Sequence, residues 1–256
     1  SHFRAGSIEK KKGLALAPER FPRYFTTQTG AIFEKESLAL SRSPRNALWL
    51  VFMLALWLAQ TALGVFLRAN LIQHRAALTD VSRILETMFV VVAVYFMASF
   101  TLRFTFPALS AERRTAWILG SAPLDLGSLY HAKFCFFAVL WSVIGLAVAA
   151  VNAAILELPI QDAASFFLLV ETAVLFVTAL GIALGAWFPN FETDDPEVLS
   201  TSLPGLGFTA AALGYGALGA YFLYQHLGGG SFAPLIAFEI FSISGIVLMF
   251  ILPPAS

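Results

Sequence analysis

The chain has 256 residues, of which 58% are hydrophobic and only 12% are charged, and its formal net charge at pH 7 is zero. Soluble domains carry about 25% charged residues, so this composition excludes a soluble globular protein and indicates a polytopic membrane protein. The balanced charge gives no reason to expect a nucleic-acid partner, and the single cysteine, Cys135, excludes an intramolecular disulfide framework.

Residues 1–46 are expected to form a basic cytoplasmic tail that ends in a helix. Four apolar residues of this helix share one face: Ile32, Phe33, Ala39 and Leu40. Such a face is typical of an interfacial helix that lies among the lipid headgroups. The alternative is a solvated cytoplasmic helix. Pro44 should break the helix just before the chain enters the membrane.

Residues 47–256 are expected to form a transmembrane domain, because they contain six apolar runs of about 20 residues, the length that crosses a bilayer. Each run is long and continuous, which favours helices over the shorter, alternating strands of a barrel. The expected fold is therefore all-α, with six spans. They are Ala47–Leu67, Thr87–Phe106, Phe134–Leu156, Ala163–Trp187, Gly205–Tyr224 and Phe232–Leu252.

Lysine and arginine are distributed unevenly between the two sides of these spans. Nine lie in residues 1–46, and four lie in or beside the loop between spans two and three: Arg103, Arg113, Arg114 and Lys133. The opposite side has only Arg68, Arg75 and Arg83. By the positive-inside rule, both termini and the loop between spans two and three are expected in the cytoplasm.

The loop over residues 107–133 is polar between two apolar runs. We expect Ser110 to cap a short helix that begins at Ala111 and that Pro123 ends. Trp117 and Leu119 give this helix an apolar patch. The patch fits either a docking surface for another protein or an ordinary loop whose tryptophan is anchored among headgroups.

A second cytoplasmic loop follows span four. Pro189 and Pro196 prevent a continuous helix, and the acidic residues between and beside them keep the turn in water. These acids are expected either to face basic residues, on a partner or on the N-terminal tail, or to be solvated.

Few residues offer chemistry within the spans. Glu171 and Glu239 are the intramembrane acids, each fitting either a polar pathway or a hydrogen-bonded packing role. Gly181 and Gly185 form a G-x-x-x-G motif that favours close helix packing over a pore role. The four histidines are scattered, so no metal site is predicted, and no catalytic set is found. The sequence also lacks a G-x-x-x-x-G-K-[ST] phosphate loop.

Three stretches in this order resemble type-2 ATP-binding-cassette (ABC) exporter permeases of a bacterial branch, over roughly residues 30–225. The first is "EKESLALSRSPRNALWL" before span one. The second carries Phe106, Pro107, Ser110, Glu112, Trp117, Leu119, Pro123 and Lys133. The third carries Phe188, Pro189, Asn190, Phe191, Glu192, Pro196 and Gly205.

The resemblance implies a permease subunit of an ATP-driven exporter in a bacterial inner (plasma) membrane, either the C-terminal half of a longer permease or one half of a homodimer. The implied partner is a separate ABC ATPase that uses the ATP, so this chain would bind no cofactor and would not be an enzyme. The residues implied to receive the ATPase's motion are Ser110, Glu112, Arg113, Arg114, Trp117, Leu119 and Pro123.

A different class of function uses the two intramembrane acids. In this alternative, the chain is an ion- or proton-coupled transporter that relies on Glu171 and Glu239, or a membrane scaffold, and has no ATPase partner.

Overall fold

The computed structural model describes residues 28–71, 78–115, 126–189 and 195–251. Regular structure in these ranges is helical, and no strand occurs in them. Within the described ranges, six helical segments are long and apolar enough to cross a membrane: Pro44–Leu67, Arg83–Glu112, Gly127–Leu156, Ile160–Trp187, Leu203–Leu227 and Ala233–Ile251. The predicted all-α fold with six spans is therefore confirmed.

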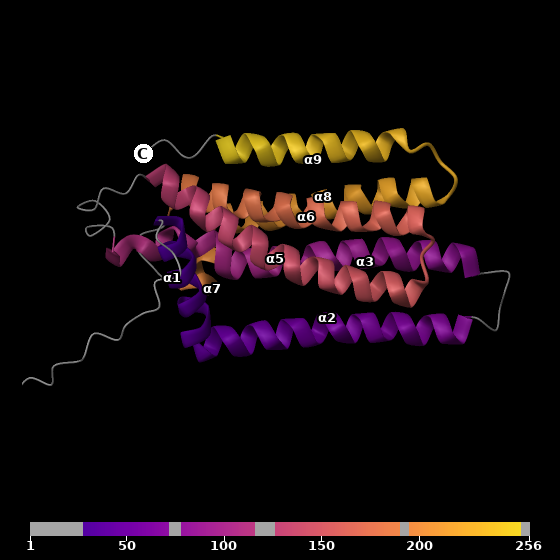
Figure 1. Ribbon diagram of the computed structural model, residues 1–256, viewed down its shortest axis with the longest axis horizontal. Coiled ribbons are helices and arrows are strands. Elements are labelled where there is room, and N and C mark those ends of the chain that lie inside the picture. Colours follow the sequence, from indigo (N-terminus) through magenta and orange to yellow (C-terminus); the bar gives the residue numbers. More distant parts are fainter. Residues whose placement is uncertain (1–27, 72–77, 116–125, 190–194, 252–256) are drawn as a thin grey trace, which may run out of the picture.

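The long helices run side by side in Figure 1, with α2 and α9 at the two edges of the view. They are α2 (Pro44–Leu71), α3 (Leu78–Phe100), α5 (Leu126–Leu156), α6 (Ile160–Trp187), α8 (Leu203–Leu227) and α9 (Ala233–Ile251). Two shorter helices, α1 (Gln28–Arg42) and α7 (Pro196–Ser200), lie at the end of the bundle at which α9 ends. We call this the α1 end.

The centre of the bundle is formed by α3 and α6. In the most apolar window of each of these two spans, 61% of the residues are buried, against 22% for α2 and 28% for α9. Stacked aromatic rings fill the space between α3 and α5: the centroids of Phe100 and Trp141 are 5.2 Å apart. The indole N–H of Trp141 donates to the Thr105 hydroxyl at 3.0 Å. The outer helices α2 and α9 thus present apolar sides outward, as a lipid environment requires.

The second span does not end where the sequence predicted. After α3 the chain continues through a π-helix, Thr101–Thr105, and two 3₁₀ turns, Phe106–Ala108 and Ser110–Thr115. Pro107 has no backbone N–H, and in an α-helix its ring would collide with the carbonyl four residues earlier. The wider π turn before it relieves this conflict. Ser110 therefore starts a 3₁₀ turn instead of capping a helix that begins at Ala111.

The chain also turns sharply between α1 and α2. Ser43 separates the two helices, and Pro44 is the first residue of α2. The predicted break at Pro44 is confirmed, and the same proline opens the next helix because its missing N–H has no partner to lose at that position.

Candidate functional site

Four charged residues from three elements meet at the α1 end, and we call them the Lys133 cluster: Lys35, Glu36, Glu112 and Lys133. Lys133, on α5, has only 1% of its side chain exposed. Its ammonium group forms ion pairs with Glu36 and, at 2.8 Å, with Glu112, and it donates to the Ala108 carbonyl at 3.1 Å. Lys35, half exposed, also pairs with Glu112. The cluster therefore ties α1 and the 3₁₀ turn Ser110–Thr115 to α5.

Most of the charged groups in this cluster are buried, so their ion pairs matter for the stability of the fold. The Glu36 and Glu112 side chains are 12% and 9% exposed. A buried charge is tolerated only when oppositely charged and hydrogen-bonding partners surround it. The two carboxylates and two ammonium groups compensate each other, so the elements that carry them are held in one arrangement.

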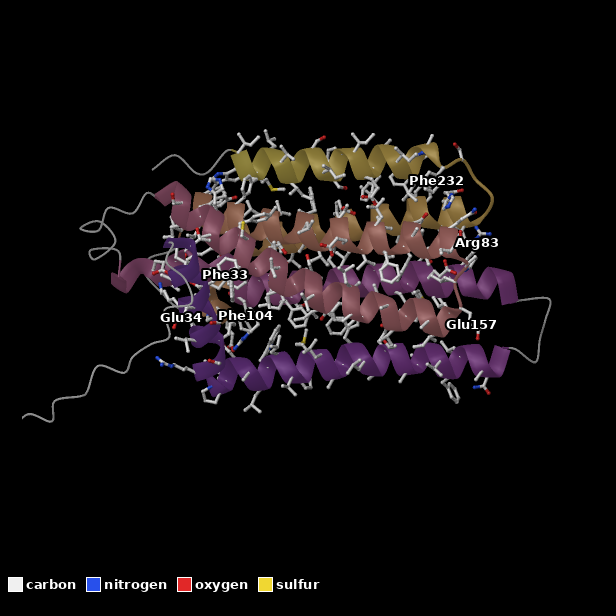
Figure 2. All side chains as sticks on the ribbon, in the orientation of Figure 1. Phe33, Glu34, Arg83, Phe104, Glu157 and Phe232 are labelled. Carbon is white, nitrogen blue, oxygen red and sulfur yellow. The ribbon has the colours of Figure 1, made fainter. Side chains whose placement is uncertain are left out.

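Apolar contacts reinforce the attachment of α1. Ile32 is buried against Leu129 and Ala132 of α5. Phe33 meets Phe136 edge to face, with ring centroids 5.3 Å apart. Figure 2 shows Phe33 turned toward the bundle at the α1 end. The predicted helix before span one is therefore present, and the part of its apolar face that carries these residues packs against α5.

A cavity of about 330 Å³ opens beside the cluster. The four cluster residues line it together with Arg103 and Asn46, and Phe104, Pro107 and Phe137 supply apolar wall. Because half of the Lys35 side chain is exposed, this cavity is in contact with solvent at Lys35. The α1 end thus combines a charged, partly open surface with a rigid buried anchor.

The residues predicted to receive motion from a partner differ in where they lie, and the structure describes only some of them. Ser110 is 3% exposed and Glu112 is 7% exposed as whole residues, so neither lies on an outer docking surface. Arg113 and Arg114 lie in the turn Ser110–Thr115. Trp117, Leu119 and Pro123 lie outside the described residues.

Three members of the cluster were missing from the predicted coupling set, namely Lys35, Glu36 and Lys133. The available signal was Lys133 itself, which sits among apolar residues near the start of a span. A lysine in that setting needs a buried carboxylate. The sequence does not show that Glu36, 97 positions earlier, supplies one.

The second predicted loop is partly described. Helix α6 ends at Trp187, and Phe188 and Pro189 follow in exposed positions. Asn190, Phe191 and Glu192 lie outside the described residues. Beyond them, Pro196 is the first residue of α7, whose N-terminus is capped by the Asp195 carboxylate; this group accepts a bond from the Glu197 N–H at 3.0 Å.

Glu197 connects this second loop to the first spans. Its carboxylate pairs with Arg45 at the start of α2 and lies 3.7 Å from Arg103 in the π-helix. At least one acid of this loop therefore faces a basic residue of the N-terminal tail, one of the two arrangements that the sequence suggested.

The two intramembrane acids have different surroundings. Glu171 on α6 accepts a hydrogen bond from the Ser142 hydroxyl on α5 at 2.6 Å. Glu239 on α9 is 6% exposed, and neither of its carboxyl oxygens makes a hydrogen bond of good geometry with a described residue, although the Thr172 side chain on α6 interacts with it. Glu171 thus links two helices through a hydrogen bond, whereas Glu239 is buried with only this weaker compensation.

This difference predicts opposite effects of the same substitution. Glu239→Leu should raise the free energy of unfolding by about 1–2 kcal/mol, because it removes a desolvated polar group and adds apolar contact. Glu171→Leu should lower it, because Ser142 loses its acceptor. Unfolding of the purified protein in detergent measures both. Destabilisation by Glu239→Leu equal to that by Glu171→Leu would show that Glu239 also has a structural partner.

The predicted packing glycines lie at close helix contacts. A Cβ at Gly181 would be 2.1 Å from Thr101 Cγ2, and one at Gly185 would be 2.1 Å from the Phe106 carbonyl oxygen. At both positions α6 therefore packs directly against the irregular end of the second span. In α8, Gly216 makes a similar approach to Val94, whereas Gly207 and Gly214 face open space.

Comparison with known proteins assigns the chain to a family. A family model described as "Putative ATP-binding cassette" matches residues 20–218 of the 256. Comparison with curated proteins and with solved structures gave no match.

This match corrects several expectations drawn from the sequence. The family is described as an ATP-binding cassette and not as a permease, so the assignment to an exporter permease subunit without a nucleotide-binding or enzymatic role was wrong. The same match overturns the alternative, an ion- or proton-coupled transporter or a membrane scaffold without an ATPase partner. The permease assignment rested on the resemblance of the three stretches. The expectation that the chain binds no nucleotide rested also on the missing G-x-x-x-x-G-K-[ST] loop, which excludes one way of cradling phosphates and not nucleotide binding as such.

The match covers more than half of the chain, including α1, the Lys133 cluster, α7 and the first four spans. The chain therefore belongs to the family described as putative ATP-binding cassette.

Proposed function

We propose that this chain is the membrane-embedded component of an ATP-binding cassette transport system, and that nucleotide-driven movement enters its six helices at the α1 end. The observation that carries the proposal is the Lys133 cluster. It joins three elements of different sequence regions through buried charges at one end of an apolar bundle. A push on α1 or on the turn Ser110–Thr115 is therefore passed to α5 through side chains.

The location proposed for this component is a plasma membrane, with the α1 end in the cytoplasm. Six apolar segments support the membrane location. The excess of lysine and arginine in residues 1–46 and around Arg103 and Lys133 supports the orientation. In this orientation the cavity of about 330 Å³ opens toward the compartment that holds ATP.

The proposed partners at this end are an ATP-hydrolysing cassette and a second six-helix unit, which is either another copy of this chain or a related half. The half-exposed Lys35 and the exposed Glu197 offer both charge signs to such a partner. The lipid-facing sides of α2 and α9 leave room for a second unit within the membrane.

The test is purification of the tagged chain from its own membrane in a mild detergent, followed by assay of vanadate-sensitive ATP hydrolysis. The proposal expects hydrolysis that co-purifies with the chain. Photolabelling with an azido-ATP analogue then shows whether this polypeptide or an attached one holds the nucleotide. Preparations with neither hydrolysis nor a labelled polypeptide would contradict the proposal.

A further inference from the structure

Two arginines bracket the second span. Arg83 and Arg103 are 20 residues apart (103 − 83), which at about 1.5 Å per helical residue is about 30 Å. This is the thickness of the hydrocarbon core of a bilayer. Figure 2 shows Arg83 at the end of the bundle opposite α1. When Arg83 lies at one headgroup boundary, Arg103 lies at the other, in the leaflet of the α1 end.

The two arginines use their hydrogen-bond donors differently. Arg83 donates to the Tyr224 carbonyl at 3.1 Å and lies 4.2 Å from the centre of the Tyr224 ring. Arg103 lies 5.1 Å from the centre of the Trp49 ring, and its side chain is 10% exposed. Its Nε has no partner among the described residues, and its Nη1 is 3.7 Å from Glu197, beyond hydrogen-bond distance. A mostly buried guanidinium with unused donors indicates a ligand.

Arg103 also lines both cavities described at the α1 end. The second cavity, of about 220 Å³, lies between α2, α3 and α7. Trp49 and Leu102 give it apolar wall, and Ser99 and Ser200 also line it.

The charges and surroundings of this second cavity define its ligand. Arg103 and Glu197 are the charged residues that line it, and Arg45, which lies outside the lining, pairs with Glu197. Together these three charges sum to +1 (2 − 1), so the cavity suits a group with one negative charge. The adjoining side of α2 is apolar and outward-facing, with Leu48 71% and Phe52 59% exposed. A charged head beside an apolar, lipid-facing surface is the chemistry of a phospholipid.

We propose that the second cavity binds the phosphodiester of a membrane phospholipid from the leaflet at the α1 end, with Arg103 as the principal ligand and the acyl chains along α2. Arginine suits this role because its planar fork matches two phosphate oxygens, and a tryptophan at the headgroup level is typical of membrane boundaries. The proposal depends on the membrane location of the chain and not on its role with ATP.

The test is native mass spectrometry of the delipidated full chain, titrated with phosphatidylglycerol or phosphatidylethanolamine. Arg103→Gln should weaken the tightest lipid-binding step roughly tenfold. Arg103→Lys, which keeps the charge but loses the fork, should give an intermediate loss and controls for folding. Arg42→Gln is the matched control, because Arg42 is an exposed arginine at the same end that lines neither cavity; it should change the binding less than twofold.

Inorganic phosphate is the second arm of the experiment. It should fail to displace the lipid at millimolar concentration, because it cannot use the apolar surface beside the cavity. Displacement of lipid by inorganic phosphate would overturn the identification of a lipid. Equal lipid binding by the wild type and by Arg103→Gln would overturn the site itself.

Discussion

Replacing Lys133 by methionine is expected to lower the free energy of unfolding by about 3–5 kcal/mol, the usual cost of removing one partner from a buried ion pair. The substitution keeps a long side chain but leaves the carboxylates of Glu36 and Glu112 buried without the ammonium group that holds them both. It also removes the bond to the Ala108 carbonyl. The expected result is a large fall in the unfolding midpoint of the purified protein in detergent.

Lys35→Met is the matched control for this experiment. Lys35 also pairs with Glu112, but half of its side chain is exposed, so water screens the pair and the loss should stay below about 1 kcal/mol. The triple variant Lys133→Met, Glu36→Gln, Glu112→Gln should recover much of the loss, because no buried charge remains. Equal effects of Lys133→Met and Lys35→Met would contradict the view that the cluster is a buried anchor.

Gly185→Ala is expected to destabilise the bundle by roughly 1–3 kcal/mol through overpacking. The new methyl group would be placed 2.1 Å from the carbonyl oxygen of Phe106. That oxygen belongs to the backbone and cannot rotate away, so α6 or the turn around Pro107 must move. Thermal unfolding of the purified variant measures the effect.

The same substitution elsewhere provides the control. Gly214→Ala places its methyl group in open space, and alanine is the better helix former by up to about 1 kcal/mol. We therefore expect no loss of stability at position 214 and a clear loss at position 185. A Gly185→Ala variant as stable as Gly214→Ala would show that α6 does not rest on Phe106 as described.

The spans could be predicted from sequence because each depends on local composition. A run of about 20 apolar residues must become a helix in lipid, where no water can satisfy the backbone. Pro44 and Pro196 likewise act locally, and both begin helices here. The G-x-x-x-G pair predicted close packing; in the structure its glycines lie against Thr101 and Phe106, contacts that the sequence did not show.

The Lys133 cluster could not be predicted in the same way, because its members come from positions 35, 36, 112 and 133 and meet only after the helices pack. The π-helix before Pro107 also escaped prediction: the second span was expected to end at Phe106, and the chain instead widened one turn and continued. Such adjustments depend on neighbouring helices that replace the lost backbone contact.

The motifs that suggested a permease have structural explanations of their own. Phe106 is 3% exposed and supplies the carbonyl against which Gly185 packs. Glu112 and Lys133 are buried partners of each other. Residues with packing roles of this kind indicate a membrane architecture. They do not indicate which subunit of an ABC system this chain is.

The central claim is that the nucleotide state of the system moves the α1 end. The most direct measurement places a spin label at Ser37→Cys, an exposed site on α1, in a Cys135→Ser background, in the complex purified from its own membrane. We expect a changed label spectrum when ATP and vanadate trap the complex, and recovery after the nucleotide is removed. Identical spectra in the nucleotide-free, ADP-bound and vanadate-trapped states would contradict it.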